Sequence, residues 1–160
     1  ASAWPGDLSA VVVVNSSVAS LSAPWLRMRP AVVPAIAGAV LARDDVNREL
    51  RVLRATTTRG PDAGETARRW ASWRAERPMS RASFGRQLAA ASAFTAPASI
   101  STPLLVVNSL GDQLCHPRCS EAIAERYSAP LRSHPDAGHD LGNDDPDWLA
   151  ATVVAWTRGE

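Results

Sequence analysis

The sequence contains no lysine, so its 17 basic residues are all arginines. These arginines are scattered along the chain rather than gathered in one stripe, and 16 acidic residues balance them to a net charge of +1. Such a balance argues against a polybasic nucleic-acid binder and against an acidic disordered tail. We attribute the missing lysine to a bacterial-like compositional bias and expect no nucleic-acid partner.

Long apolar runs and a cysteine framework are also missing. No run approaches the roughly 18 apolar residues that would cross a bilayer, so we expect no membrane partner. The two cysteines, Cys115 and Cys119, lie too close together to indicate a disulfide framework. The first residues, Ala1–Asp7, have neither a methionine nor the basic start of a signal peptide. We therefore expect a cytoplasmic protein.

What is present is enough apolar sequence, 46% of 160 residues, for one core. The first strand is predicted at Val11–Val14, a continuous β-branched run without the alternation of a half-exposed strand. Such a run is typical of a parallel strand buried on both faces, in the middle of a sheet. Later strands are predicted at Pro103–Asn108 and Pro130–His134, each followed by a helix, at Pro117–Tyr127 and at Asp145–Arg158. This order predicts parallel crossovers.

The segment between the first two strands, 18–97, is predicted to be helical because apolar residues recur at helical spacing and strand signals are scarce. Four helices are expected, at Ala31–Ala42, Asp44–Thr57, Glu65–Ala75 and Ser80–Ala93, with a break at Gly60-Pro61-Asp62. A crossover between parallel strands needs only about a dozen residues, so we interpret 18–97 as an inserted cap or lid. The predicted fold class is α/β, with about three parallel strands, a four-helix cap insertion and flanking helices in one domain, 1–160.

Two ionisable residues follow glycines where predicted strands end. Asp112 comes after Gly111 beyond one strand, and His139 comes after Gly138 beyond the next. The carboxyl ends of parallel strands meet at one sheet edge, where ligands and catalytic groups collect. There, an aspartate and a histidine can orient a nucleophilic triad, in which the histidine moves the proton and the aspartate fixes the ring. A surface aspartate or a capping histidine is the ordinary interpretation of either residue alone, but their joint placement favours the pair.

These features together resemble the C-terminal half of an α/β-hydrolase. The shared elements are a strand that ends in Asn15-Ser16-Ser17, a helical cap, the strand-Gly-Asp element at Asp112, and the Ala-Gly-His element at His139 before a final amphipathic helix. The resemblance covers nearly the whole chain. It implies that Asp112 is the triad acid and His139 the triad base. It also implies a carboxylesterase-type hydrolase that acts on a small-molecule ester without a cofactor.

The nucleophile of that family is missing from the sequence. The G-x-S-x-G pentapeptide that would carry it, ahead of both partners in chain order, does not occur. Ser16 and Ser17 are the nearest candidates, although turn serines commonly cap their own backbone. Ser109 and Cys115 flank the predicted acid and would have to reach the histidine past it. The alternative interpretation is a catalytically inactive, truncated α/β-hydrolase fragment that folds as an oligomer.

Aromatic residues of the predicted cap are candidates for lining an enclosed pocket for the substrate. They are Trp25, Trp70, Trp73 and Phe84. Trp70 and Trp73 are three positions apart on an expected helix, a spacing that is equally typical of packing between cap helices. The sequence leaves both interpretations open.

Two segments suggest metal binding at first inspection. A Cys-His-x-x-Cys cluster begins at Cys115 and could hold zinc with His134 as the fourth ligand. Pro117 and the expected helix start make this cluster more typical of a helix N-terminus. The acidic segment Asp140–Asp147 lacks the ligand alternation and the terminal glutamate of a calcium loop, so we expect it to cap the final helix. We therefore expect no metal and no cofactor.

A sheet that begins with Val11–Val14 would expose this strand as an edge. Its unpaired backbone groups would then be prone to pair with another copy. We therefore predict a homodimer, or another oligomer, that covers this strand or the surface left bare by the missing N-terminal half.

Overall fold

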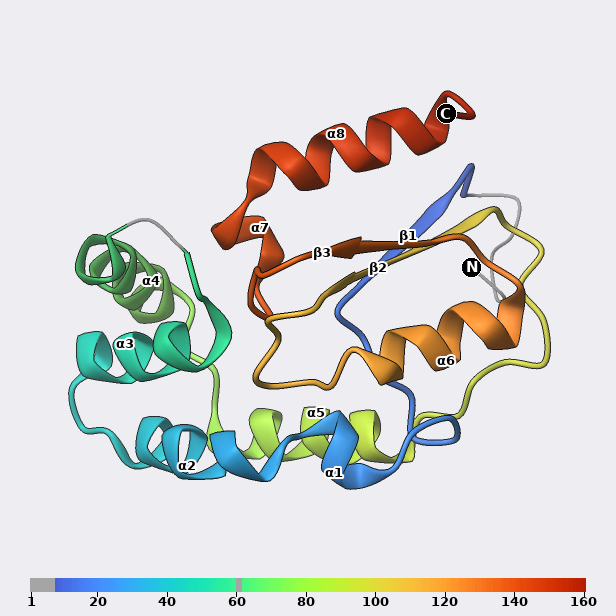
Figure 1. Cartoon of the computed structure of the whole chain (residues 1–160). Coiled ribbons are helices and arrows are strands. Elements are labelled where there is room, and N and C mark those ends of the chain that lie inside the picture. Colours follow the sequence, from blue (N-terminus) through green and yellow to red (C-terminus); the bar gives the residue numbers. More distant parts are fainter. Residues whose placement is uncertain (1–7, 60–61) are drawn as a thin grey trace.

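The computed structural model describes residues 8–59 and 62–160 (Figure 1). The start at Ala1–Asp7 and two residues of the expected break, Gly60 and Pro61, lie outside the described residues, whereas Asp62 of that break is the N-cap of α4. The elements in chain order are β1 (Val11–Val14), α1 (Pro24–Arg27), the 3-10 helix η2 (Pro30–Val32), α2 (Val33–Leu41), α3 (Asp45–Thr56), α4 (Ala63–Glu76), α5 (Arg81–Ala93), β2 (Leu104–Ser109), α6 (Arg118–Tyr127), β3 (Leu131–His134), α7 (Leu141–Asp144) and α8 (Pro146–Thr157).

Three parallel strands form the sheet in the order β1, β2, β3. Val11 lies opposite Leu104, and Val106 lies opposite Leu131. Every residue of β2 is buried, whereas every residue of β1 is only half-buried. The apolar run Val11–Val14, expected from its composition to be central, therefore forms an edge strand, because β2 is the only described strand that pairs with it.

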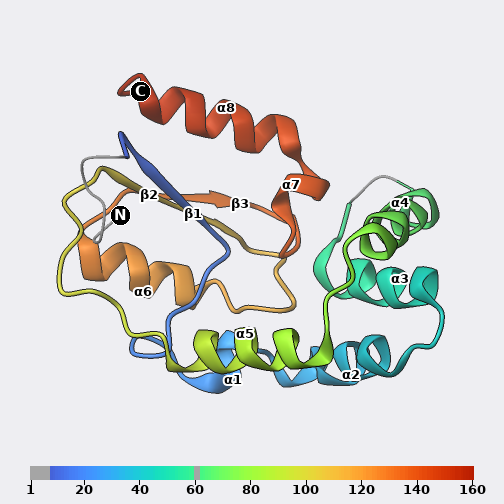
Figure 2. The same cartoon turned by 180° about the vertical axis from the view of Figure 1, so that it is seen from behind.

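Helices cover both faces of the sheet (Figures 1 and 2). On one face, Ile123 of α6 packs in a cluster with Val106. On the other, Leu105 clusters with Leu141 of α7 and with Trp148 of α8. Successive side chains of a strand point to opposite faces, so β2 contributes to both cores. This position explains why its sequence is apolar without alternation.

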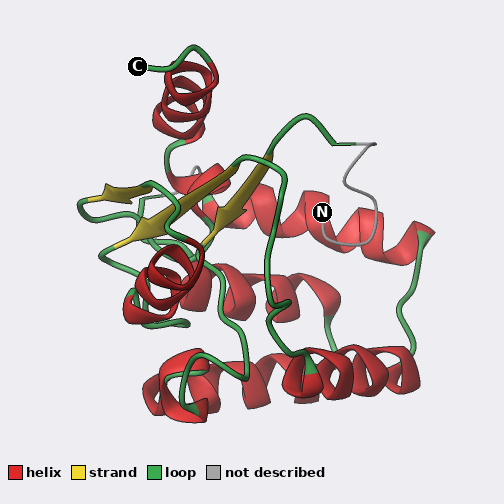
Figure 3. Ribbon diagram, turned by 90° about the vertical axis from the view of Figure 1, so that its right-hand side faces the viewer, coloured by secondary structure: helices red, strands yellow, loops and turns green. Residues whose placement is uncertain are grey.

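The helices between β1 and β2 form a separate group beside the sheet (Figure 3). In this group, α3 packs against both α2 and α4. The α3 helix begins at the N-cap Asp44, whose carboxylate accepts a hydrogen bond from the Asn47 N–H, and it buries Leu53. Trp25 lies in the short helix α1.

The acidic segment before α8 caps this helix, as expected from the sequence. The Asp145 carboxylate accepts a hydrogen bond from the Trp148 N–H at 3.0 Å. Within the described residues, none of the helices combines the length and apolarity that crossing a bilayer requires.

Candidate active site

Asp112 lies in the turn after β2 and is buried, with its side chain 2% exposed. Its Oδ1 accepts hydrogen bonds from the backbone N–H groups of Leu114 at 2.8 Å and Cys115 at 2.9 Å. The residue before it has no room for a side chain, because a Cβ on Gly111 would lie 2.4 Å from the carbonyl oxygen of Asp136. The turn therefore holds the carboxylate against the loop that follows β3.

His139 lies in that loop, which is attached to the helical segment between β1 and β2. A Cβ on Gly138 would lie 2.6 Å from the carbonyl oxygen of Thr56, so a larger residue there would push the loop away. The same carbonyl accepts a hydrogen bond from the Asp140 N–H at 2.8 Å. The loop is thus fixed on both sides of the histidine, while the imidazole itself remains 30% exposed.

The two loops bring the side chains of Asp112 and His139 together. Asp112 Oδ2 lies 2.8 Å from His139 Nδ1. A carboxylate only accepts hydrogen bonds, so Nδ1 carries the proton and Nε2 presents a lone pair. Among the described residues, no group forms a hydrogen bond with Nε2. One nitrogen is held and the other is free, which is the arrangement an imidazole needs to take a proton from a nucleophile.

Asp144 ties the His139 loop to the helical segment. Its carboxylate accepts hydrogen bonds from the N–H groups of Gly138 at 2.6 Å, Thr58 at 2.9 Å and Arg59 at 3.0 Å. Burial raises the pKa of this carboxyl, but the hydrogen bonds from Arg59, Thr58 and Gly138 outweigh burial and hold the pKa below its usual value of 3.8. The sequence indicated only a capping role, because the partner Thr58 is 86 residues away.

The candidate serine nucleophiles are engaged elsewhere. Ser16 donates its hydroxyl to the carbonyl oxygen of Val14 at 2.9 Å, as turn serines do. Ser109 is fully buried, and its hydroxyl oxygen accepts a hydrogen bond from the amide side chain that follows β1. In the part of the chain that the structure describes, neither hydroxyl bonds to His139.

Cys115 is a buried thiol and a poor nucleophile. Burial, together with the neighbouring thiol of Cys119, raises the pKa of Cys115 to about 12. The thiol therefore stays protonated near neutral pH, whereas the thiolate is the reactive form. Ser17, the remaining serine candidate, lies beside this thiol and lowers its pKa by less than the other groups raise it.

An apolar cavity of about 530 Å³ lies among helices α2 to α5. Its apolar lining includes Ile36, Val52, Met79 and Phe84. Two other lining residues adjoin the pair, because the Thr56 carbonyl binds the Asp140 N–H and the Leu114 N–H binds the Asp112 carboxylate. The volume falls within the range of small-molecule sites. Neither Asp112 nor His139 lines this cavity, but Leu114 and Thr56 connect it to the segments that carry them.

The structure separates the four aromatic candidates. Phe84 lines the cavity, whereas Trp25, Trp70 and Trp73 do not. Trp25 and Trp73 are 65% and 54% exposed, and Trp73 lies 5.5 Å from the guanidinium of Arg69. The other lining residues, both aliphatic and polar, come from several segments, and their spacing in the sequence gave no sign of a shared pocket.

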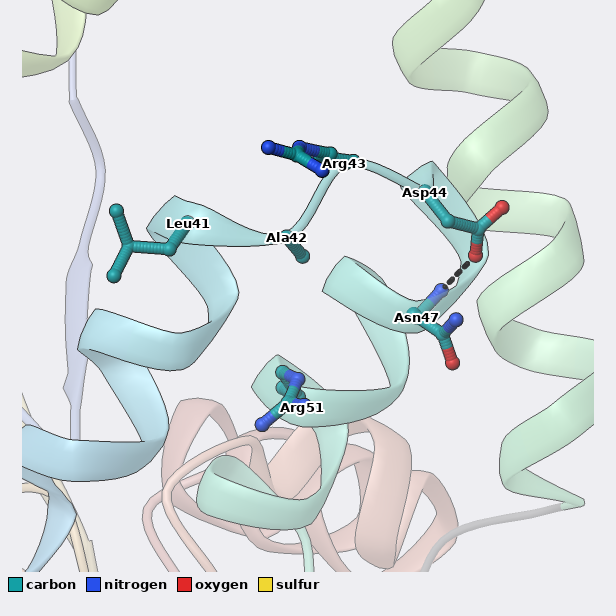
Figure 4. A pocket seen from close by; sticks show the side chains of 6 residues that line it. All are labelled: Leu41, Ala42, Arg43, Asp44, Asn47 and Arg51. Atoms are coloured by element: carbon teal, nitrogen blue, oxygen red, sulfur yellow. Dashed lines mark hydrogen bonds between the residues drawn. The ribbon is translucent and has the colours of Figure 1, made fainter.

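A second hollow lies at the connection between α2 and α3, apart from the pair (Figure 4). It is lined by Leu41, Ala42, Arg43, Asp44, Asn47 and Arg51. The Asp44 carboxylate accepts the Asn47 N–H at 2.7 Å, so it caps the start of α3. As far as the described residues go, no lining residue bonds to Asp112 or His139, and we place the candidate active site at the other cavity.

His134 takes part in the fold rather than in a metal site. Its Nδ1 accepts the Ala137 N–H at 2.9 Å, its Nε2 lies 3.3 Å from Asp145 Oδ2, and its ring packs edge-on against Trp148. Both ring nitrogens are therefore occupied, and neither is free to join Cys115 around zinc. Across residues 8–59 and 62–160, no three histidine, cysteine, aspartate or glutamate side chains gather as metal ligands.

No protein-family model and no curated protein matches this chain. Solved structures do. The chain is similar to a thermophilic esterase, at 14% identity and a TM-score of 0.66, covering 98% of this chain and 59% of that one. It is similar to an α/β-hydrolase-fold protein from Chitinophaga pinensis, at 18% identity and a TM-score of 0.62, covering 96% of this chain and 57% of that one. It is also similar to the 2-hydroxy-6-oxo-6-phenylhexa-2,4-dienoate hydrolase of Rhodococcus sp. strain RHA1, at 15% identity and a TM-score of 0.71, covering 98% of this chain and 57% of that one.

The chain spans between 57% and 59% of the length of these three proteins. Its three parallel strands, its flanking helices and the large helical segment between β1 and β2 form a partial α/β-hydrolase fold. The fold class predicted from the sequence is confirmed. At such low identity the likeness establishes the fold alone, so the activity has to be argued from the geometry of the site.

Proposed function

We propose that this chain carries the acid and the base of a triad that hydrolyses carboxylic esters, with Asp112 as the acid and His139 as the base. The observation that carries the proposal is the 2.8 Å contact between Asp112 Oδ2 and His139 Nδ1, which leaves Nε2 free to accept a proton. The burial of Asp112 and the exposure of the imidazole support the proposal, because the buried carboxylate orients the ring while part of the ring remains accessible to solvent.

The reaction follows from the two nitrogens of the imidazole. A nucleophilic hydroxyl gives its proton to His139 Nε2 while its oxygen attacks the ester carbonyl carbon, and Asp112 stabilises the imidazolium through Nδ1–H. The imidazolium returns the proton to the alkoxide as the C–O bond breaks, which releases the alcohol and leaves an acyl group on the nucleophile. Water then repeats these steps, releases the acid and restores the nucleophile. General acid–base catalysis of this kind is worth about a hundred- to ten-thousandfold.

The substrate class is proposed from the cavity beside the pair. Its apolar lining, which includes Ile36, Met79 and Phe84, supports a small-molecule ester with an apolar acyl or alcohol group. In this proposal the helical segment 18–97 acts as the cap of the site.

The nucleophile is proposed to come from a segment that this sequence does not contain, either on another chain or in a longer form of the protein. Within the described residues the hydroxyls of Ser16 and Ser109 bond elsewhere, which supports this arrangement. The same observation favours a second candidate function, a catalytically inactive α/β-hydrolase fragment.

Hydrolysis of p-nitrophenyl butyrate by the chain alone separates the two candidates. An oriented imidazole can attack such an activated ester itself, so we expect saturable turnover above buffer that His139→Ala removes. His116→Ala is the matched control, because His116 belongs to another loop, where it accepts the Arg118 N–H, and this variant should keep the turnover. Equal rates for wild type and His139→Ala would support the inactive fragment.

A labelled fluorophosphonate followed by peptide mapping tests the origin of the nucleophile. We expect no labelled peptide that contains Ser16, Ser17 or Ser109. A label on one of them that disappears in His139→Ala would place the nucleophile within this chain.

A further inference from the structure

Asn15, the residue that follows β1, is a buried amide that the mechanism above does not use. It is 5% exposed, and its φ of 44° lies in the left-handed region, which asparagine enters more readily than most residues. Its N–H donates to the carbonyl of Val107 at 2.9 Å and extends the β1–β2 ladder by one residue. The chain then turns, and the side chain lies across the carboxyl ends of the neighbouring strands.

This side chain bonds to the end of β2, which leads to Asp112, and to the loop that carries His139. Its Oδ1 accepts the N–H of Ser109, the last residue of β2, at 2.7 Å. Its Nδ2 donates to the Ser109 hydroxyl oxygen at 3.0 Å and to the carbonyl oxygens of Gly138 at 3.1 Å and His139 at 2.8 Å. One amide therefore joins the segment that leads to Asp112 with the backbone of the histidine itself.

We propose that Asn15 is a positioning residue that sets the distance between Asp112 and His139. The proposal rests on the proposed function, because it concerns the same acid and base. By tying the His139 carbonyl to the end of β2, the amide fixes how far the imidazole stands from the carboxylate.

The backbone at His139 is hydrogen-bonded on two sides, through its N–H groups on one side and through its carbonyl groups on the other. On the helical side, the Asp144 carboxylate accepts the N–H of Gly138 at 2.6 Å. On the sheet side, the Asn15 side chain donates hydrogen bonds to the carbonyl oxygens of Gly138 and His139. Loss of the Asn15 side chain would therefore leave the loop attached to the helices but release it from β2.

An amide is the chemistry that this position requires, because it offers a donor and an acceptor together. Asn15→Asp keeps the shape and the acceptor for Ser109, but it sets a carboxylate against the carbonyl oxygens of Gly138 and His139. Buried groups left without their bonds are costly, so the loop would shift away. Asn15→Gly removes every side-chain bond and keeps the left-handed backbone, which glycine adopts freely.

The test is the proton NMR spectrum of the full chain downfield of the amide signals, where the Nδ1–H of an imidazole bound to a carboxylate resonates. This signal reports the Asp112–His139 contact without requiring turnover. We expect it in the wild type and expect it to be lost in Asn15→Asp and Asn15→Gly. Val13→Ala, on the same strand, is the matched control for general destabilisation and should retain the signal.

Retention of the signal by Asn15→Asp at its wild-type position would overturn the inference. A wild-type chain without the signal would overturn both the inference and the proposed pair, whereas a chain that shows the signal but no turnover would remove only the proposed function. With turnover, Asn15→Asp should lower kcat about a hundredfold and change KM by less than about twofold, because it misplaces the base without touching the cavity. A rise in KM with kcat unchanged would count against positioning.

Discussion

Gly111 is where the Asp112 turn passes closest to the loop after β3. A Cβ there would lie 2.4 Å from the carbonyl oxygen of Asp136 and 2.7 Å from that of Ala137, and these backbone atoms cannot rotate away. We expect Gly111→Ala to lower the free energy of unfolding in urea by about 1–3 kcal/mol. Gly85→Ala is the control, because a Cβ there meets nothing within 4 Å, and it should be neutral or stabilising by up to about 1 kcal/mol. Equal effects would contradict the close approach.

Asp144 makes the attachment of the His139 loop sensitive to acid. Burial raises the pKa of Asp144, but the hydrogen bonds from Arg59, Thr58 and Gly138 lower it overall, below 3.8. A folded-state pKa below the unfolded one gives a stabilisation that is complete above the unfolded value and is lost as the pH falls through the folded value.

Asp144→Asn should therefore lower the free energy of unfolding by about 1–2 kcal/mol near neutral pH, where the wild-type carboxylate is charged. The difference between the two proteins should shrink as the pH falls well below 3.8. Urea denaturation at both pH values measures it. Asp147→Asn, at the exposed start of α8, should change stability by less than about 1 kcal/mol. A difference for Asp144→Asn that persists in acid would contradict the linkage.

At the scale of elements, the sequence predicts what depends on neighbouring residues. The run Leu104–Val107 predicts a buried strand because all of its residues are apolar. The Gly-Asp and Gly-His pairs mark the points where the predicted strands give way to loops. The fold class follows from the order of these elements. The apolar composition of Val11–Val14 indicates a central strand, but the strand lies at an edge. Its position depends on which other strands pair with it, and its own residues do not determine that.

Contacts between distant elements are what the sequence could not predict. Asn15 meets Ser109 across 94 residues, and Thr58 meets Asp144 across 86. Neither contact has a periodic pattern, because each depends on how two loops pack. The cavity at Phe84 is of the same kind, since its lining comes from several helices that are far apart in the sequence.

Helix α5 brings Phe84 to the cavity, so this element should influence substrate size. We expect Phe84→Ala to raise KM for p-nitrophenyl butyrate about three- to tenfold with little change in kcat, because the ester loses apolar contact. Trp73→Ala, on the exposed side of α4, is the control and should leave KM unchanged. An equal rise for both variants would remove the cavity from the substrate site.

In the whole molecule, the edge of β1 that no described strand pairs with is the surface that we propose a second copy covers. Val11 and Asn15 donate their N–H groups to β2, so by alternation the N–H of Val12 faces the free edge. We expect size-exclusion chromatography with light scattering to give the mass of a dimer at micromolar concentration. Val12→Pro removes the edge donor and should yield a monomer, whereas Val12→Thr keeps it. A wild-type monomer would contradict the dimer.

A double-mutant cycle on p-nitrophenyl butyrate hydrolysis, with Asp112→Asn, His139→Gln and the two combined, shows whether Asp112 and His139 act as a pair. Residues that act as one unit have non-additive effects. We expect Asp112→Asn to slow the wild-type chain strongly but to have no effect once His139 is Gln. Turnover that His139→Gln retains, and that Asp112→Asn then lowers by its full factor, would contradict the pair.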